Sequence, residues 1–345
     1  MDNIINLQKK IVPELTNLLV ERYQILRQVS HENPIGRRAL SSRLGISERV
    51  LRSQVEFLKT GGLLAFSSAG MTVTEEGTVI LRELADYVHK LQGLNTLEQL
   101  LCDKLHIGKV IIIPGDSDQE EVVKREIGRA AARILGNLIG DGQRHIVAVS
   151  GGSTMAALAA NVSGSHPQTT VVPARGGLGD NVELQANTIA TVLAQRMGAA
   201  YRQLYVPDSV SAEILNSILA EDVGVKTVVD IIKQADILVH GVGQAAVMAR
   251  HRRLPTDFIE QLLAEGAVGE AFGQYCSLDG RQVYMTNNAG LMLQDLPRIG
   301  TVIGVAGGRS KAAAILSVVR ASRQDILLTD EAAATDIAAM LGDIS

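Results

Sequence analysis

The sequence predicts an α/β protein in two parts, a small N-terminal helical domain closed by a β-hairpin and a larger domain built on a doubly wound parallel sheet. Helical periodicity dominates residues 15–105, with one pair of strand-like runs inside it. From Lys109 onward, short apolar runs alternate with helix-length segments, which is the pattern of a parallel sheet with crossover helices. The 345 residues, of which 46% are hydrophobic, are enough for two or three domains.

Charge and cysteine content narrow the class of protein. The formal net charge of −4 argues against a surface that binds nucleic acid throughout, but it leaves room for a local basic patch. Cys102 and Cys276, with one histidine near Cys102, indicate neither a disulfide framework nor a metal site. A secretion signal is not apparent, and the apolar runs are too short to span a bilayer. We expect a cytoplasmic protein without a cofactor or a membrane partner.

Three helices are expected in the N-terminal domain. Apolar residues recur at helical spacing over 15–26, which predicts a supporting helix. A second short helix is expected over 36–44, and Gly45 allows a sharp turn before Ser47, which is a good N-cap. The third helix is expected over 48–59. Two helices joined by such a turn predict a helix-turn-helix.

The third helix has one apolar face and one charged face. Leu51, Val55 and Leu58 point to one side and should pack in the domain core. Arginines near the start of a helix suit guanine edges or phosphates in the major groove, because the guanidinium fork matches paired acceptors. We therefore predict contact with double-stranded operator DNA; a solvated helix face is the alternative. The predicted DNA-binding residues are Arg37, Arg38, Ser47, Arg49, Arg52 and Ser53, and Arg43 is expected to add a phosphate contact.

A hairpin and a long helix complete the N-terminal part. Residues 63–74 form two strand-like runs around a polar turn, which makes residues 1–75 a winged helix-turn-helix domain. Residues 76–96 are predicted to be a linker helix with an apolar stripe. This helix either pairs with its counterpart in a second subunit or packs within its own chain. The effector-binding domain is expected to span residues 97–345.

The larger domain is predicted from alternating strands and helices. Helix-length segments such as 120–138 and 184–197 separate the apolar runs. Strands are expected at 110–113, 146–149, 171–172, 204–206, 237–239, 302–305 and 326–328. In an open parallel sheet of this kind, a ligand binds at the carboxyl ends of the strands.

Four glycine-rich segments follow those strands. Residues 150–154 should turn backbone N–H groups and hydroxyls toward an anion at the start of a helix. Residues 173–179 add the permanent charge of Arg175, and residues 240–243 form a third loop. Residues 306–311 form a fourth, with Lys311 expected one turn into a helix. Together they predict a site for a polyanionic small molecule, and the absence of both nucleotide-binding glycine motifs disfavours a nucleotide.

Two further features leave alternatives open. The basic run 250–253 is either a solvated helix end or part of a sugar-phosphate pocket, and Glu270 either accepts hydrogen bonds from sugar hydroxyls or lies on the surface. A sugar-phosphate isomerase or deaminase with an appended DNA-binding domain is the alternative function. Asp116, Asp180 and His240 are its candidate acids and bases, but capping or loop roles fit them equally well, and no catalytic residue is assigned.

Several segments of the chain match one known family: 34–38, 44–52, 115–118, 172–179, 185–188 and 306–308. Through them the chain resembles the SorC-type bacterial transcription regulators over nearly its whole length. The resemblance implies a repressor of a glycolytic operon whose effector domain is similar in fold to sugar-phosphate isomerases and glucosamine-phosphate deaminases. It also implies fructose 1,6-bisphosphate, or a related sugar phosphate, as an inducer that alters a homo-oligomeric assembly, a dimer or tetramer.

The resemblance also implies which residues bind the effector. Ser153 stands where a threonine is expected and retains the hydroxyl, and either Arg250 or Arg252 matches the family's arginine. Combined with the glycine-rich loops, the predicted ligand-binding set is Gly151, Gly152, Ser153, Thr154, Arg175, Gln185, Gly243, Arg250, Arg252, Glu270, Gly307, Gly308 and Lys311.

Overall fold

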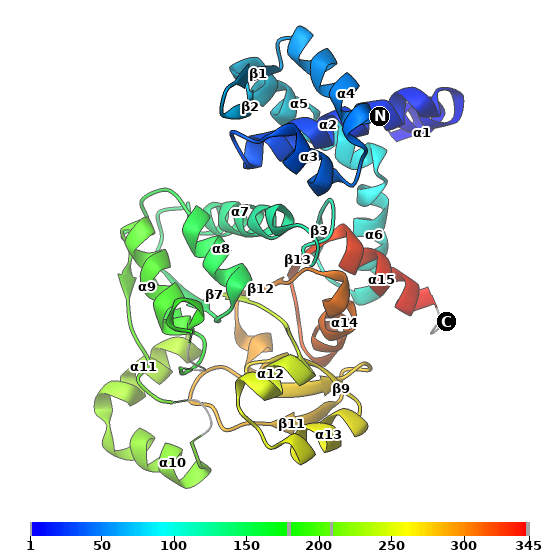
Figure 1. Cartoon of the computed structure of the whole chain (residues 1–345). Helices are drawn as coiled ribbons and strands as arrows, with labels where there is room; N and C mark the ends of the chain where they lie inside the picture. Colours follow the sequence, from blue (N-terminus) through cyan, green and yellow to red (C-terminus); the bar gives the residue numbers. More distant parts are fainter. Residues whose placement is uncertain (1, 178–180, 208–209, 343–345) are drawn as a thin grey trace. The chain divides into compact units, whose positions relative to one another are not determined.

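The computed structural model of the chain describes residues 2–177, 181–207 and 210–342 (Figure 1). The chain divides into two compact units, Met1–Leu97 and Glu98–Ser345. Helix α6 (Leu94–Leu105) runs across the division. None of the helices described is both long and apolar enough to cross a membrane.

The N-terminal unit is a winged helix-turn-helix domain, as predicted. Gly45 ends α3 in the left-handed conformation, with φ 63°, and Ser47 caps α4 by accepting a hydrogen bond from the Val50 N–H at 3.4 Å. The supporting helix α2 is longer than predicted, and α1, which precedes it, was not predicted. The elements are α1 (Asp2–Ile11), α2 (Pro13–His31), α3 (Arg37–Leu44), α4 (Glu48–Thr60), β1 (Leu64–Ser67), β2 (Gly70–Val73) and α5 (Glu75–Leu91).

Local contacts fix the hairpin against the helices. Leu51, Val55 and Leu58 of α4 are buried in the core of this unit, as predicted. Ile35, in the connection before α3, exchanges backbone hydrogen bonds of 3.1 and 2.8 Å with Met71 of β2. A side chain at Gly70 would bring a Cβ to 2.7 Å from the Ile35 carbonyl oxygen, so glycine is required there.

Helix α5 packs within its own unit. The Tyr23 hydroxyl of α2 donates to the Leu81 carbonyl at 3.3 Å, and the Tyr87 hydroxyl of α5 donates to Gln8 of α1 at 2.6 Å. These contacts support the packing alternative for the predicted linker helix. Pairing with a second subunit stays a prediction.

The second unit contains a parallel sheet in the order β3-β13-β12-β7-β4-β5-β6, seven strands among the described residues. The doubly wound α/β prediction is thus confirmed. The direction in which the chain adds strands reverses between β4 and β7, so these strands flank the topological switch point. The strands are β3 (Lys109–Ile113), β4 (His145–Val149), β5 (Thr169–Pro173), β6 (Ala200–Tyr201), β7 (Ile237–His240), β12 (Thr301–Val305) and β13 (Ile326–Asp330).

One predicted strand is wrong. Leu204 and Val206 are buried, but the strand at this edge is β6, at Ala200–Tyr201. The side chain of Asn187 accepts from the Leu204 N–H at 2.9 Å and donates to its carbonyl at 3.0 Å. The Asn187 amide therefore satisfies the backbone N–H and carbonyl of Leu204, which would otherwise need a neighbouring strand as their hydrogen-bond partner.

Helices cover the sheet and enclose a hydrophobic core. Residues of α7, α8 and α9 pack with β4, β5, β7 and β12, and Figure 1 shows these three helices side by side. The helices of this unit are α7 (Glu121–Leu138), α8 (Ser153–Asn161), α9 (Ala186–Met197), α10 (Ala212–Glu221), α11 (Val223–Lys233), α12 (Ala245–His251), α13 (Thr256–Ala264), α14 (Ala312–Ala321) and α15 (Glu331–Gly342).

The second unit also contains a small antiparallel sheet that was not predicted. Its strands lie in the order β11-β10-β9-β8, between β7 and β12 in the chain. Helix α14 packs against β9, which attaches this sheet to the rest of the unit. The strands are β8 (Gly243–Gln244), β9 (Ala267–Ala271), β10 (Gln274–Ser277) and β11 (Gln282–Met285).

Candidate effector pocket and DNA-binding surface

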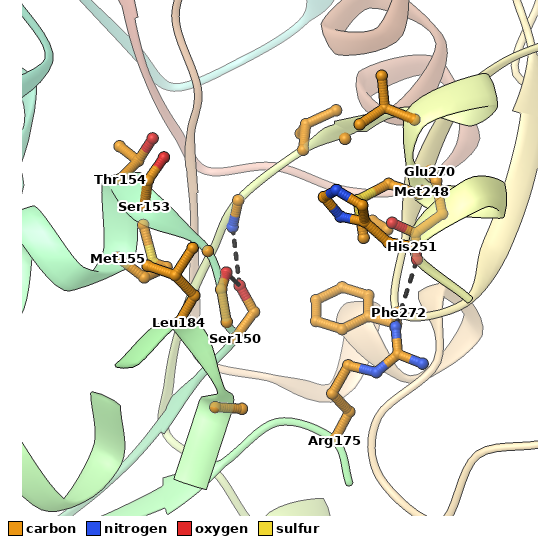
Figure 2. Close-up of a pocket in the computed structure, with 18 of the residues that line it drawn as sticks. Ser150, Ser153, Thr154, Met155, Arg175, Leu184, Met248, His251, Glu270 and Phe272 are labelled. Carbon is orange, nitrogen blue, oxygen red and sulfur yellow. Dashed lines mark hydrogen bonds and ion pairs between the residues drawn. The ribbon is translucent and has the colours of Figure 1, made fainter. Parts of the chain in front are cut away.

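A cavity of about 580 Å³ lies at the carboxyl ends of β4 and β7, the position expected for a ligand of a doubly wound sheet. Figure 2 shows its two walls, with Ser153 and Thr154 on one and Arg175, Glu270 and Phe272 on the other. The small antiparallel sheet and α12 build the second wall.

The first wall is the loop between β4 and α8. Gly152 has φ 113° and precedes the helix without a side-chain cap, so the first N–H groups of α8 are available to an anion. Ser150 fixes this loop by accepting a hydrogen bond from the Gly241 N–H of the β7 loop at 2.9 Å. Ser153 and Thr154 add hydroxyls to this wall. The arrangement suits a phosphate.

Lys311 adds a positive charge to the cavity. It lies in a 3₁₀ turn, Arg309–Lys311, immediately before α14, rather than one turn into a helix as predicted. Burial lowers the pKa of its ammonium group, and the nearby carboxylate of Asp118 partly offsets this effect. An anionic ligand would stabilise the charged form.

The backbone N–H groups of the predicted anion loop at residues 306–311 already bind carboxylates of the protein itself. The N–H groups of Gly308, Arg309 and Ser310 donate to the carboxylates of Asp330, Asp116 and Asp118 at 2.6, 3.3 and 2.8 Å, respectively. Gly307 and Gly308 were predicted to bind the ligand, but the structure does not place them in the cavity lining. A Cβ at either position would clash with Asp330 or Asp118, so both glycines serve close packing.

The second wall is organised around one buried carboxylate. Glu270 is 3% exposed, so the surface alternative for this residue is wrong. Its Oε1 lies 3.3 Å from Nη1 of Arg175 and 2.6 Å from Nη2 of Arg252, and it accepts the Gly273 N–H. Arg252 also donates to the Tyr275 hydroxyl at 2.9 Å. The network fixes Arg175, whose side chain lines the cavity in Figure 2.

The structure separates the two arginines that the sequence left as alternatives. Arg250 is exposed and lines the cavity, whereas Arg252 is 8% exposed and lies outside the lining. The prediction that Arg252 contacts the ligand is therefore not supported, because Glu270 and Tyr275 already engage its guanidinium group. His251 and Arg253 of the same run line the cavity as well.

Most of the predicted ligand residues meet in this cavity. Those in its lining are Gly151, Gly152, Ser153, Thr154, Arg175, Gln185, Gly243, Arg250, Glu270 and Lys311. The predicted ligand-binding set omits several lining residues, among them Met155, Leu184, Val242, Met248, His251, Arg253 and Phe272. The basic run signalled His251 and Arg253, but the apolar residues carry no pattern that distinguishes a pocket wall from a core.

The candidate acids and bases of the enzyme alternative do not form a catalytic site in the part of the chain described. His240 is fully buried behind the wall, and burial lowers the pKa of its imidazole, which favours the neutral form. Asp116 accepts from the backbone N–H groups of Asp118 and Arg309. Neither residue lines the cavity. Asp180 lies outside the described residues.

In the N-terminal unit, each predicted DNA-binding residue is exposed. Arg49, Arg52 and Ser53 lie on α4 outside the face that buries Leu51, Val55 and Leu58, and Arg37 and Arg38 lie at the start of α3. Arg38 lies 3.4 Å from Glu48, an exposed ion pair of little strength. Ser47 is exposed too, and its hydroxyl caps α4.

Comparison with known proteins assigns a domain family to each part of the chain. Residues 89–339 match the Sugar-bind family model of a sugar-binding domain, and residues 18–88 match the CggR N-terminal DNA binding domain. The central glycolytic genes regulator of Priestia megaterium is 42% identical over 339 residues, covering 98% of each chain. That of Bacillus subtilis is 42% identical over 336 residues, covering 97% of this chain and 98% of its own.

Solved structures agree with this assignment. A crystal structure from Enterococcus faecalis, assigned to the SorC family of transcriptional regulators, is 37% identical with a TM-score of 0.65, covering 70% of this chain and 99% of its own. The fold and the two matched domains define a transcriptional regulator that couples a DNA-binding domain to a sugar-binding domain, and not an enzyme. The chain belongs to the SorC family, together with the central glycolytic genes regulators.

Proposed function

We propose that this regulator represses a glycolytic operon and that fructose 1,6-bisphosphate, bound in the cavity, releases it from operator DNA. The names of its relatives support glycolytic genes as the target. The observation that carries the effector assignment is an anion-binding group on each wall, the N-terminus of α8 without a side-chain cap on one and Arg175 with Arg250 on the other, with Lys311 also in the lining. Such a cavity suits a sugar with a phosphate at each end.

Release from DNA requires that the effector bind two states of the protein with different affinity. We propose that these states differ in homo-oligomeric assembly on the operator, as dimer or tetramer. A regulator that binds operator DNA acts in the bacterial cytoplasm, where both the DNA and phosphorylated sugars are present.

Fructose 1,6-bisphosphate is expected to stabilise the full chain selectively. At a concentration 100 times its dissociation constant, the effector should add about 2.7 kcal/mol to the free energy of unfolding of the domain that binds it. The measurement is a thermal-unfolding titration with fructose 1,6-bisphosphate, fructose 6-phosphate and fructose as the unphosphorylated control. An operator band shift that ignores millimolar fructose 1,6-bisphosphate would contradict this inducer assignment.

Effector affinity is expected to fall at alkaline pH. Lys311 is the only lysine among the lining residues that the structure describes, and burial already lowers its pKa. A bound phosphate stabilises the ammonium and raises this pKa, so the contribution of Lys311 to affinity is present below the pKa of the free protein. It is lost as the pH rises through the pKa of the complex. The phosphate groups, whose second pKa is about 6, stay dianionic over this range.

Calorimetric titrations of the wild type, Lys311→Arg and Lys311→Met at increasing pH separate this effect from others. The arginine variant should keep its affinity at alkaline pH, because its guanidinium group stays charged. The methionine variant should bind more weakly at neutral pH and show no alkaline decline. An unchanged decline in the methionine variant would assign it to another group.

A further inference from the structure

Two bulky residues with positive φ lie in the wall of the effector cavity. The non-glycine residues with positive φ, among those described, are His106 at 56°, Arg253 at 55° and Phe272 at 55°. Arg253 and Phe272 both line the cavity. Side chains rarely adopt this conformation because the Cβ crowds the backbone, and aromatic residues gain no local hydrogen bond there. Such strain is typical of residues that a functional site needs.

Phe272 occupies a turn position that favours glycine or asparagine. Ala271 of β9 pairs with Gln274 of β10, so Phe272 and Gly273 are the central residues of a two-residue hairpin turn. Both have positive φ, 55° and 81°, as in a type I′ turn. Glycine is required at the second position, because a Cβ there would meet the Thr286 hydroxyl and lie 3.2 Å from Arg175. At the first position the chain carries a phenyl ring instead.

The surroundings hold the turn in this conformation. Glu270 accepts the Gly273 N–H on one side, and the Thr286 N–H donates to the Gly273 carbonyl at 2.9 Å on the other. The same Glu270 oxygen pairs with Arg175 and Arg252. The ion-pair network around Glu270 that fixes Arg175 in the second wall therefore also fixes the direction in which the Phe272 side chain leaves the backbone.

Phe272 is 4% exposed, and the part that the protein leaves uncovered borders the cavity. The centroid of its ring lies 5.0 Å from that of His240 at an interplanar angle of 49°, and His240 is buried behind it. Figure 2 shows the ring at the cavity wall with Arg175 and Glu270, across from Ser153 and Thr154. An aromatic face carries partial negative charge, and the C–H groups of a sugar ring, polarised by neighbouring oxygens, carry partial positive charge.

We infer that Phe272 is the platform for the sugar ring, packing on its C–H face between the two phosphate-binding walls and so selecting cyclic sugar bisphosphates over other bisphosphates. This inference rests on the proposed function, because it assumes that a sugar bisphosphate occupies the cavity. Phe272 here determines specificity, whereas the cationic groups supply charge recognition that any bisphosphate could use.

The test compares two ligands on three full-length proteins, the wild type, Phe272→Met and Phe272→Tyr. Fructose 1,6-bisphosphate has a ring between its phosphates, and hexane-1,6-diol bisphosphate carries the same phosphates on a flexible chain. Methionine conserves apolar volume without an aromatic face, and tyrosine keeps that face. Calorimetric titration measures both affinities, and the quantity compared between proteins is the ratio of the two. The entropy that the flexible ligand loses on binding affects this ratio equally in each protein, so it cancels in the comparison.

In Phe272→Met the preference for fructose 1,6-bisphosphate should fall by about five- to ten-fold, near the upper range that an aromatic contact adds beyond its buried area. Phe272→Tyr should keep the preference. A methionine variant that keeps the wild-type ratio, or that loses both ligands equally, overturns the inference and leaves the proposed function standing. A wild type that binds neither bisphosphate contradicts the proposed function, and the inference fails with it.

Discussion

Replacing Glu270 with glutamine is expected to lower the free energy of unfolding of the sugar-binding domain by about 3–5 kcal/mol, the usual cost of breaking a buried ion pair from one side. The variant keeps the shape of the side chain but removes its charge. Glu270 is 3% exposed and lies within ion-pair distance of both Arg175 and Arg252, so two buried guanidinium groups would lose their carboxylate. Calorimetric unfolding of the full chain in a buffer without phosphate or sulfate measures the loss.

A matched control and a double variant isolate the cause. Glu121→Gln removes an exposed partner of Lys124 and should change stability by less than about 1 kcal/mol. Adding Arg252→Met to Glu270→Gln removes one of the two arginine charges that have lost their carboxylate. The double variant should therefore be destabilised by less than the sum of the two single variants. A loss of less than about 1 kcal/mol in Glu270→Gln, or strict additivity in the double variant, would show that the network does not stabilise this wall.

The N-terminal domain was predicted well because its determinants are local. The turn at Gly45, the cap at Ser47 and the apolar spacing of Leu51, Val55 and Leu58 each act within a few residues. The β1–β2 hairpin was predicted for the same reason, since its two strands are adjacent in the chain. Helix α1 was missed, although its apolar residues also recur at helical spacing.

Several residues of the second wall of the effector pocket were predicted, but the antiparallel sheet that builds it was not, because its determinants are distant in sequence. The strand that carries Glu270 contains glycine and a buried charge, which argue against a strand until the arginines that neutralise the charge are placed. The loop at 306–311 matches its prediction only in part, because Lys311 lines the cavity whereas the N–H groups of Gly308, Arg309 and Ser310 already bind carboxylates of the protein. Backbone N–H groups bind a phosphate or an aspartate carboxylate by the same interaction, and only the fold brings Asp116, Asp118 and Asp330 to that loop.

Replacing Arg52 with alanine is expected to weaken operator binding by about 1–3 kcal/mol if its guanidinium reads a base edge. Arg52 is exposed on α4, outside the face of that helix that buries Leu51, Val55 and Leu58. The matched control is Arg82→Ala, an exposed arginine of α5 in the same unit that pairs with Glu83 at 3.2 Å. This control removes the same charge from the domain, so it should weaken binding much less than Arg52→Ala.

Salt dependence and sequence preference then distinguish the two roles open to Arg52. Titration of operator fragments carrying single base changes, at several salt concentrations, measures both. A base contact should make one operator position tolerant of substitution in the Arg52→Ala variant. A phosphate contact should instead weaken binding to all fragments alike and reduce the salt slope by about 1, because one fewer counterion is released. If Arg52→Ala binds every fragment as the wild type does, helix α4 does not use this arginine to contact DNA.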